Sequence, residues 1–141
     1  MPSISVLEFQ RLIDKELPLV HLFGMRAVSI GHGEAVMRMH FNPDLIRPGG
    51  TIAGPALMAL ADATLYAVVL GMIGQVELAV TTSLNINFLR KPPPADVIAE
   101  GRILKLGKRL AVGEVLLLSA ELDEPVAHVT GTYSIPPLSG H

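Results

Sequence analysis

The sequence predicts an α+β domain in which one long buried helix is wrapped by a curved antiparallel sheet of five to six strands. Two patterns support this prediction. Residues 55–73 are apolar on almost every face of a helix, whereas the segments from residue 80 onward alternate apolar and polar side chains with a period of two. A helix that is apolar all round needs more than one flat neighbour, and a strongly curved sheet can provide it.

The stretch 47–74 reads as a glycine-rich turn that opens this helix. Gly54 is predicted at the N-cap and Pro55 at the first helical position, where the missing N–H of proline costs nothing. Asp62 is the one carboxylate that interrupts the helix. Because burial removes the hydration of a carboxylate, proteins pair such a group or use it, so Asp62 is the first candidate for function.

Asp62 and its helix also admit two simpler interpretations. Asp62 could accept hydrogen bonds from Thr64, Tyr66 or a neighbouring strand and serve the fold alone. The helix is also long enough to cross a membrane. An aspartate near the middle of a span costs about 2.5 to 3.5 kcal/mol, and no basic flank or aromatic belt brackets the segment, so we expect a core helix and no membrane partner.

The composition limits the class of protein. The 141 residues suit a single domain over 1–141. Half of them are hydrophobic, which excludes disorder and leaves more apolar surface than a monomer exposes, so we expect self-association. A net charge of -2 argues against a nucleic-acid partner, and the lack of cysteine excludes disulfides, thiolate nucleophiles and cysteine-based metal sites.

The N-terminal segment 1–18 predicts a helix. Ser5 and Glu8 have the spacing of a capping box, apolar residues follow at helical spacing, and Pro18 ends the helix. Charges run through this segment and no apolar core of a signal peptide is present, so we expect a cytoplasmic protein. Residues 136–141 are expected to form a flexible tail.

The alternation of apolar and polar residues predicts the strands. A hairpin is predicted ahead of the central helix, from residues 25–30 and 34–41 around the turn 31–33. Behind the helix an antiparallel meander of four strands is predicted, over residues 80–88, 96–106, 110–120 and 126–135. In the first of these four, the even-numbered residues are expected to face the core: Val80, Thr82, Leu84, Ile86 and Phe88.

This order of elements, the glycine-rich helix start and Leu60-Ala61-Asp62 inside the helix resemble the hotdog fold, specifically acyl-CoA thioesterases of the phenylacetate-degradation (PaaI-like) type. The resemblance covers about residues 19–135. The family pattern at the helix start is Asn-x-x-Gly-x-x-His-Gly-Gly, followed by a helical acidic residue. Aligned on Asp62, this chain keeps Gly50 and Gly54 but has other residues at three positions of the pattern, namely Arg47, Ala53 and Pro55.

The resemblance implies a catalytic set. The backbone N–H of Gly54 would polarise the thioester carbonyl, and Asp62 would act as base or nucleophile. A helix N-terminus suits this task because it presents unpaired N–H groups where an oxyanion develops. The family also carries a hydroxyl on the strand after the helix that places water; Thr81 is the best match, with Thr82 and Ser83 as rivals.

The resemblance also implies how substrate is held. The substrate would be an acyl-CoA, with coenzyme A present as part of the substrate, no other cofactor and no metal. The expected substrate-binding residues are Arg47, Gly50, Ala53, Thr82, Tyr66, Arg90, Lys91, Lys108 and Arg109, the last four as contacts for coenzyme A phosphates. Residues 19–23, Leu57, Met58 and Tyr66 are candidates to line the acyl pocket.

Family members are homodimers whose sheets join edge to edge, often as dimers of dimers, so Asp62 would act with Gly54 of a second subunit. We therefore expect an acyl-CoA thioesterase. The alternative from another class is a non-catalytic acyl-CoA binding or sensing protein, which Arg47 and Ala53 suggest because the family has other polar groups there. A hydratase ranks last, because this chain has no histidine between His40 and His128.

Overall fold

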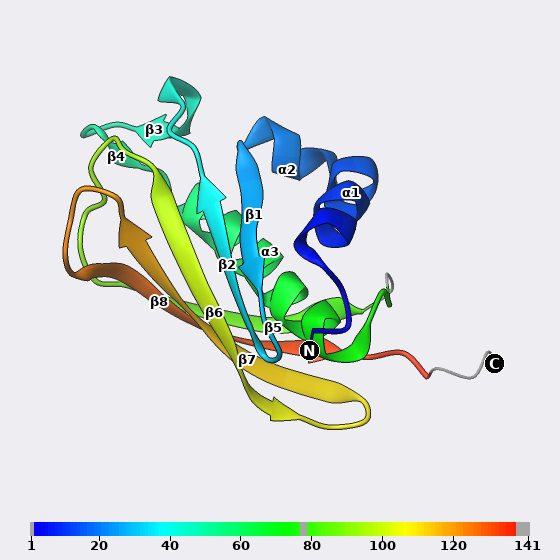
Figure 1. Cartoon of the computed structure of the whole chain (residues 1–141). Coiled ribbons are helices and arrows are strands. Elements are labelled where there is room, and N and C mark those ends of the chain that lie inside the picture. The colour runs from blue at the N-terminus through cyan, green and yellow to red at the C-terminus, as the bar shows by residue number, and fades with distance from the viewer. Residues whose placement is uncertain (1, 77–78, 138–141) are drawn as a thin grey trace.

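The computed structural model describes residues 2–76 and 79–137 and shows one curved antiparallel sheet folded around a central helix (Figure 1). The helices are α1 (Val6–Glu16), α2 (Pro18–Leu22) and α3 (Gly54–Ile73). The main sheet consists of β1 (Met25–Ile30), β2 (Glu34–Met39), β5 (Val80–Phe88), β6 (Val97–Leu106), β7 (Leu110–Ser119) and β8 (Pro125–Ser134). This arrangement confirms the predicted α+β hotdog architecture and its long wrapped helix.

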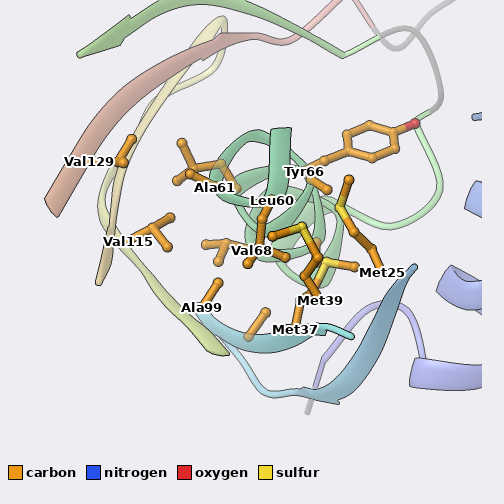
Figure 2. Close-up of a cluster of buried hydrophobic side chains, with 14 of the residues drawn as sticks. Met25, Met37, Met39, Leu60, Ala61, Tyr66, Val68, Ala99, Val115 and Val129 are labelled. Carbon is orange, nitrogen blue, oxygen red and sulfur yellow. The ribbon is translucent and has the colours of Figure 1, made fainter. Parts of the chain in front are cut away.

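Helix α3 is the centre of the core. By length and composition it could cross a membrane, but 72% of its most apolar window is buried inside the fold, as in the core helix of a domain. In Figure 2, Leu60 and Val68 point from α3 toward side chains of the surrounding strands, among them Met37, Val115 and Val129. The hydrophobic core is therefore built around this helix.

The predicted start of α3 was wrong by one residue. Ala53, not Gly54, is the N-cap, because the Ala53 carbonyl oxygen accepts from the N–H groups of Ala56 and Leu57 at 3.1 and 3.3 Å. Gly54 is therefore the first helical residue and Pro55 the second. The N–H of Gly54 still belongs to the first turn, whose donors have no acceptor within the helix.

The strand order corrects the predicted four-strand meander. The order is β1-β2-β6-β7-β8-β5, so only β6, β7 and β8 follow one another as a meander. Strand β5 pairs with β8 at the far edge of the sheet, and β2 lies next to β6 instead. The reason is the central helix: the chain crosses the fold along α3 between β2 and β5, and the sheet then curves back around the helix from the other side (Figure 1).

A β-bulge in β5 corrects the predicted faces of that strand. Thr81 pairs with Tyr133 and Ser83 with Thr132, so Thr82 is the extra residue between two regular pairs. One extra residue reverses the parity of a strand. Thr81 therefore shares the inner face with Leu84, whereas Val80, predicted to face the core, is 54% exposed.

Two glycines let α3 approach the sheet closely. A Cβ atom added to Gly131 on β8 would lie 2.5 Å from Leu65 Cδ1, and one added to Gly113 on β7 would lie 2.8 Å from Leu65 Cδ2. Both distances are shorter than a van der Waals contact. The side chain of Leu65 therefore occupies the space that a larger residue on either strand would need.

The N-terminal segment packs against the same core. The capping box of α1 is confirmed, because Glu8 N–H donates to Ser5 Oγ at 3.1 Å and Ser5 N–H donates to Glu8 Oε1 at 3.0 Å. Phe9 of α1 contacts Tyr66 of α3, with ring centroids 5.8 Å apart. Among the described residues, the sequence did not predict four short elements: α2, the 3-10 helix η1 (Pro43–Leu45), β3 (Ile46–Arg47) and β4 (Thr51–Ile52). Residues 138–141 of the predicted tail lie outside the described residues.

Asp96 ties the end of β2 to the start of β6. Asp96 Oδ1 accepts from the Phe41 N–H at 2.6 Å, and Oδ2 accepts from Arg38 Nε at 2.8 Å and lies 3.4 Å from His40 Nδ1. The Phe41 N–H is the main cause that holds the pKa of Asp96 below its ordinary value of 3.8, and Arg38 and His40 act in the same direction. The folded state therefore favours the charged form of this side chain.

Substitution Asp96→Asn is expected to lower the free energy of unfolding at pH 7 by about 1.5 kcal/mol, because a charged acceptor is replaced by a neutral one. A lowered folded-state pKa contributes stability above the unfolded value of 3.8 that is lost as the pH falls through the folded value. The difference from wild type should therefore shrink below about pH 4. Urea unfolding at several pH values measures this, with Asp123→Asn in the exposed β7–β8 turn as control; an equal loss at pH 3 and pH 7 would contradict it.

Candidate active site

Asp62 stands on α3 opposite two hydroxyl groups from the neighbouring strands. Thr81 Oγ1 donates to Asp62 Oδ1 at 2.5 Å, and the Tyr133 hydroxyl donates to the same oxygen at 2.9 Å. Thr64 is not a donor to Asp62, because its hydroxyl donates to the Leu60 carbonyl oxygen at 2.7 Å. The partly buried carboxylate is thus held by strands β5 and β8.

The two hydroxyls reach Asp62 because of the register of the sheet. Thr81 and Tyr133 are paired residues on adjacent strands, and both face α3. The bulge at Thr82 turns Thr81 inward; without it, Val80 would take this face. Thr81, the candidate for the hydroxyl that places water, therefore lies beside Asp62, whereas Thr82 points elsewhere and donates to the Thr132 carbonyl oxygen at 3.2 Å.

An apolar cavity of about 290 Å³ opens beside Asp62. Its polar groups come from Asp62, Thr81 and two tyrosines, and the rest of the wall is aliphatic. The lining residues are Leu17, Leu19, Val20, Met25, Ala59, Asp62, Ala63, Tyr66, Ala79, Val80, Thr81 and Tyr133. Of the candidates for an acyl pocket, Leu19, Val20 and Tyr66 lie in this wall, whereas Met58 is 38% exposed.

A second cavity, of about 440 Å³, lies at the N-terminus of α3. It is lined by Arg47, Thr51, Ile52, Gly54, Leu57, Phe88, Leu89, Arg90, Lys91 and Pro92. Phe88 lies over the helix start, since a Cβ atom added to Gly54 would be 3.2 Å from its ring. This cavity also contains three of the residues predicted to bind substrate, Arg47, Arg90 and Lys91. They share its wall with Gly54, whose N–H is predicted to bind the oxyanion.

The two cavities lie at opposite ends of β5, one beside Val80 and Thr81 and the other beside Phe88. Gly54 and Asp62 are eight residues apart in α3, which places them about 12 Å apart along the helix axis. Groups that act on one carbonyl must lie within about 3 to 3.5 Å of the reacting atoms. A single chain therefore does not bring Gly54 and Asp62 to one thioester.

The remaining predicted residues lie at both ends of the sheet. Arg90 is held by β8, because its two terminal nitrogens donate to the Pro125 carbonyl oxygen and Glu124 Oε2, each at 2.7 Å. Gly50 lies in the exposed turn between β3 and β4, next to Arg47, and Ala53 caps α3. Lys108 and Arg109 lie in the β6–β7 turn, which joins the other end of β8 through the hydrogen bond from Ile135 N–H to the Arg109 carbonyl oxygen. The structure therefore does not gather the four predicted phosphate-binding cations within one chain.

Tyr133 is a site residue that the sequence did not reveal. Its place in the alternation of β8 put it on the inner face, and a buried tyrosine hydroxyl usually has a hydrogen-bond partner. The sequence therefore indicated that the Tyr133 hydroxyl is buried and hydrogen-bonded, but it did not identify Asp62 as the partner. Burial, followed by the negative charge of Asp62, raises the pKa of Tyr133 well above its ordinary value of 10, so this hydroxyl keeps its proton.

The outer face of the sheet carries a separate charged group. His128 Nε2 lies 2.9 Å from Glu114 Oε1, and Arg102 Nε donates to Glu114 Oε2. His128, then Arg102, holds the pKa of Glu114 below its ordinary value. Over residues 2–76 and 79–137, no group of three or more histidine, cysteine, aspartate or glutamate side chains is placed to hold a metal ion.

A family model described as the thioesterase superfamily matches residues 49–126, which is more than half of the chain. This chain belongs to the thioesterase superfamily. The matched range runs from the turn before α3 into β8 and includes Gly54, Asp62 and Thr81, whereas Tyr133 lies beyond it. Family membership supports hydrolysis of thioesters as the general activity.

Several known proteins are similar to this thioesterase-superfamily chain. A candidate esterase from Saccharolobus solfataricus is 30% identical over 115 residues, which cover 81% of this chain and 75% of the relative. The crystal structure of a candidate thioesterase from Silicibacter sp. TM1040 is 38% identical and covers 97% of this chain and 95% of that chain, with a TM-score of 0.88. A point mutant of the phenylacetic acid degradation protein PaaI from Thermus thermophilus is 26% identical over 84% of this chain and 99% of that chain, with a TM-score of 0.75. The expected likeness to the PaaI-like type is thus confirmed.

The two adjacent threonines of β5 give a matched test of this geometry. Thr81→Val removes a donor to Asp62 and is expected to lower the turnover of a thioester on the order of 10-fold. Thr82→Val removes a hydroxyl that bonds the Thr132 carbonyl oxygen and should leave turnover within about twofold of wild type. Release of free thiol from the best thioester measures both. Equal losses in the two variants would contradict the assignment of Thr81.

Proposed function

We propose that this protein hydrolyses acyl-CoA thioesters at sites shared between two subunits. The observation that supports this most directly is the Asp62 carboxylate, held by two hydroxyls at the wall of an apolar cavity. A partly buried acid with defined partners beside an apolar pocket suits the hydrolysis of an acyl group. Asp62, Gly54 and Thr81 are the proposed catalytic residues.

In this mechanism Asp62 takes a proton from a water molecule, and the water oxygen forms a bond to the thioester carbonyl carbon. The N–H of Gly54 from the second subunit donates to the oxyanion that develops. Collapse of the tetrahedral intermediate breaks the C–S bond, and the departing thiolate of coenzyme A recovers the proton from Asp62. Direct attack by Asp62 is the second route: the carboxylate would displace the coenzyme A thiolate and form a mixed anhydride, which water then hydrolyses. Attack of labelled water on the Asp62 carbon of that anhydride would leave label in the carboxylate after a single turnover, which the first route does not.

The free edge of β5 supports a shared site. In the described sheet β5 is a terminal strand that pairs with β8 on one side. Antiparallel pairing of two β5 strands would set the Thr81 end of one beside the Phe88 end of the other. Asp62 of one subunit would then meet Gly54 of the second, which the separation of about 12 Å within one helix otherwise prevents. We propose a homodimer on this basis, and a dimer of dimers from the family resemblance.

The same pairing would arrange the substrate. The cavity of about 290 Å³ would take the acyl group, and Tyr66 in its wall favours an aryl or medium-length chain. Arg47, Arg90 and Lys91 of the second subunit would face the coenzyme A phosphates. Lys108 and Arg109 lie at the Thr81 end of the sheet, so they would approach this site from the subunit that supplies Asp62. We propose a cytoplasmic location.

A panel of acyl-CoA esters tests the function, with phenylacetyl-CoA included because of the PaaI relative. We expect wild type to release coenzyme A from at least one ester, and Asp62→Asn to fall by at least about 100-fold, since this variant removes the base. Thiol release measures turnover. Asp44→Asn, in the exposed turn before β3, is the matched control. Full activity in Asp62→Asn would exclude the mechanism.

The alternative binding or sensing function predicts a different result from the same panel. Calorimetry would then show saturable binding of an acyl-CoA without release of thiol. The hydroxyls on Asp62 argue for the enzyme, because a site that only binds a neutral thioester has no use for a positioned carboxylate there.

A mixing experiment tests the shared site. Gly54→Pro removes the proposed oxyanion donor, and the ψ of 140° at Ala53 suits a residue that precedes proline. Each of Asp62→Asn and Gly54→Pro should be inactive alone. After the two are unfolded and refolded together, half of the dimers are mixed and each mixed dimer has one intact site, so about one quarter of wild-type activity should return. If no activity returns although mixed dimers form, both groups act within one chain.

A further inference from the structure

Tyr133 and Thr81 donate to the same oxygen of Asp62. The distances to Oδ1 are 2.9 Å from the Tyr133 hydroxyl and 2.5 Å from Thr81 Oγ1. A carboxylate oxygen has two lone pairs and accepts about two hydrogen bonds. Oδ1 is therefore fully used by the protein, and Oδ2 is the oxygen that neither hydroxyl occupies.

The position of Tyr133 is fixed by its surroundings. Its side chain is 4% exposed, and its ring stacks on Tyr66 with centroids 6.1 Å apart and an interplanar angle of 20°. Tyr66 in turn contacts Phe9 of α1. The hydroxyl also lies 3.0 Å from the Asp62 carbonyl oxygen, so its one hydrogen is shared between this oxygen and Oδ1 of the same residue. The packing of the Tyr133 ring therefore fixes where its hydroxyl oxygen lies relative to Asp62.

Tyr133 is a permanent donor. Burial, followed by the charge of Asp62, raises the pKa of the hydroxyl above its ordinary value of 10, so it is protonated at neutral pH. It is therefore unsuited to act as an acid or base itself. Its hydrogen bond can instead fix the orientation of the Asp62 carboxylate.

We propose that Tyr133 is a positioning residue, which with Thr81 saturates Asp62 Oδ1 and turns Oδ2 toward the thioester and its attacking water. The inference rests on the proposed function of Asp62.

Tyr133→Phe tests the role, because it removes the hydroxyl and keeps the ring that stacks on Tyr66. We expect kcat for the best acyl-CoA ester to fall on the order of 10-fold with KM within about twofold of wild type. Thr130→Val removes a hydroxyl from the opposite face of the same strand and should leave both constants unchanged. In an Asp62→Asn background, Tyr133→Phe should cause no further loss, since its effect passes through Asp62.

Crystal structures of wild type and Tyr133→Phe test the geometry without reference to activity. The Asp62 carboxylate should hold one orientation in wild type and rotate, or divide between two orientations, in the variant. Wild-type kcat in Tyr133→Phe, an equal loss in the Asp62→Asn background, or an unchanged carboxylate would each overturn the inference. If Asp62→Asn itself stays active, the proposed function fails instead, and the two crystal structures still decide whether Tyr133 positions the carboxylate.

Discussion

Burial of α3 is the constraint on which the rest of this structure depends. A helix of 20 residues with one charged side chain leaves no face for water, so cover must come from several directions. Six antiparallel strands provide it by curving, and their order follows from this need: β1 and β2 approach the helix from one side, and β5 returns to it from the other. The N-terminal helices α1 and α2 lie beside the part of α3 that the sheet does not cover (Figure 1), where Phe9 of α1 contacts Tyr66.

The strands that surround α3 also supply the polar groups of the site. Asp62 is tolerated in the core helix because strands that surround α3 contribute hydroxyls at the correct height, one from β5 and one from β8. Charge-assisted hydrogen bonds of this kind offset the desolvation of a carboxylate. The fold thereby keeps an ionisable group at the wall of an apolar cavity. Structure and proposed function share these contacts, so the structural role of Asp62 and the functional one describe a single arrangement.

Local patterns allowed much of this to be predicted from the sequence. The periodicities of α3 and of the six strands depend on near neighbours along the chain, and the structure places these elements within one or two residues of the predicted bounds. Pairing of β5 with β8 was not predictable in this way, because it depends on how the chain crosses α3. The bulge at Thr82 reversed the predicted faces of Val80 and Thr81, since one extra residue changes parity without changing the pattern. Tyr133 was missed because alternation indicates the face of a residue but not which helical side chain lies opposite.

The glycines beneath Leu65 have a consequence for the site as well as for packing. Gly131 is two residues before Tyr133 on β8, and Leu65 is three residues after Asp62 on α3. The contact between Leu65 and Gly131 therefore lies close along the chain to both partners of the hydrogen bond between Tyr133 and Asp62. A methyl group on Gly131 would overlap Leu65, and separation of the two layers to relieve that overlap would lengthen the hydrogen bond. Gly131 and Leu65 thus affect the geometry at Asp62 although neither lines the cavity. Substitutions of the glycines that pack against α3 are therefore expected to be less tolerated than substitutions of exposed residues.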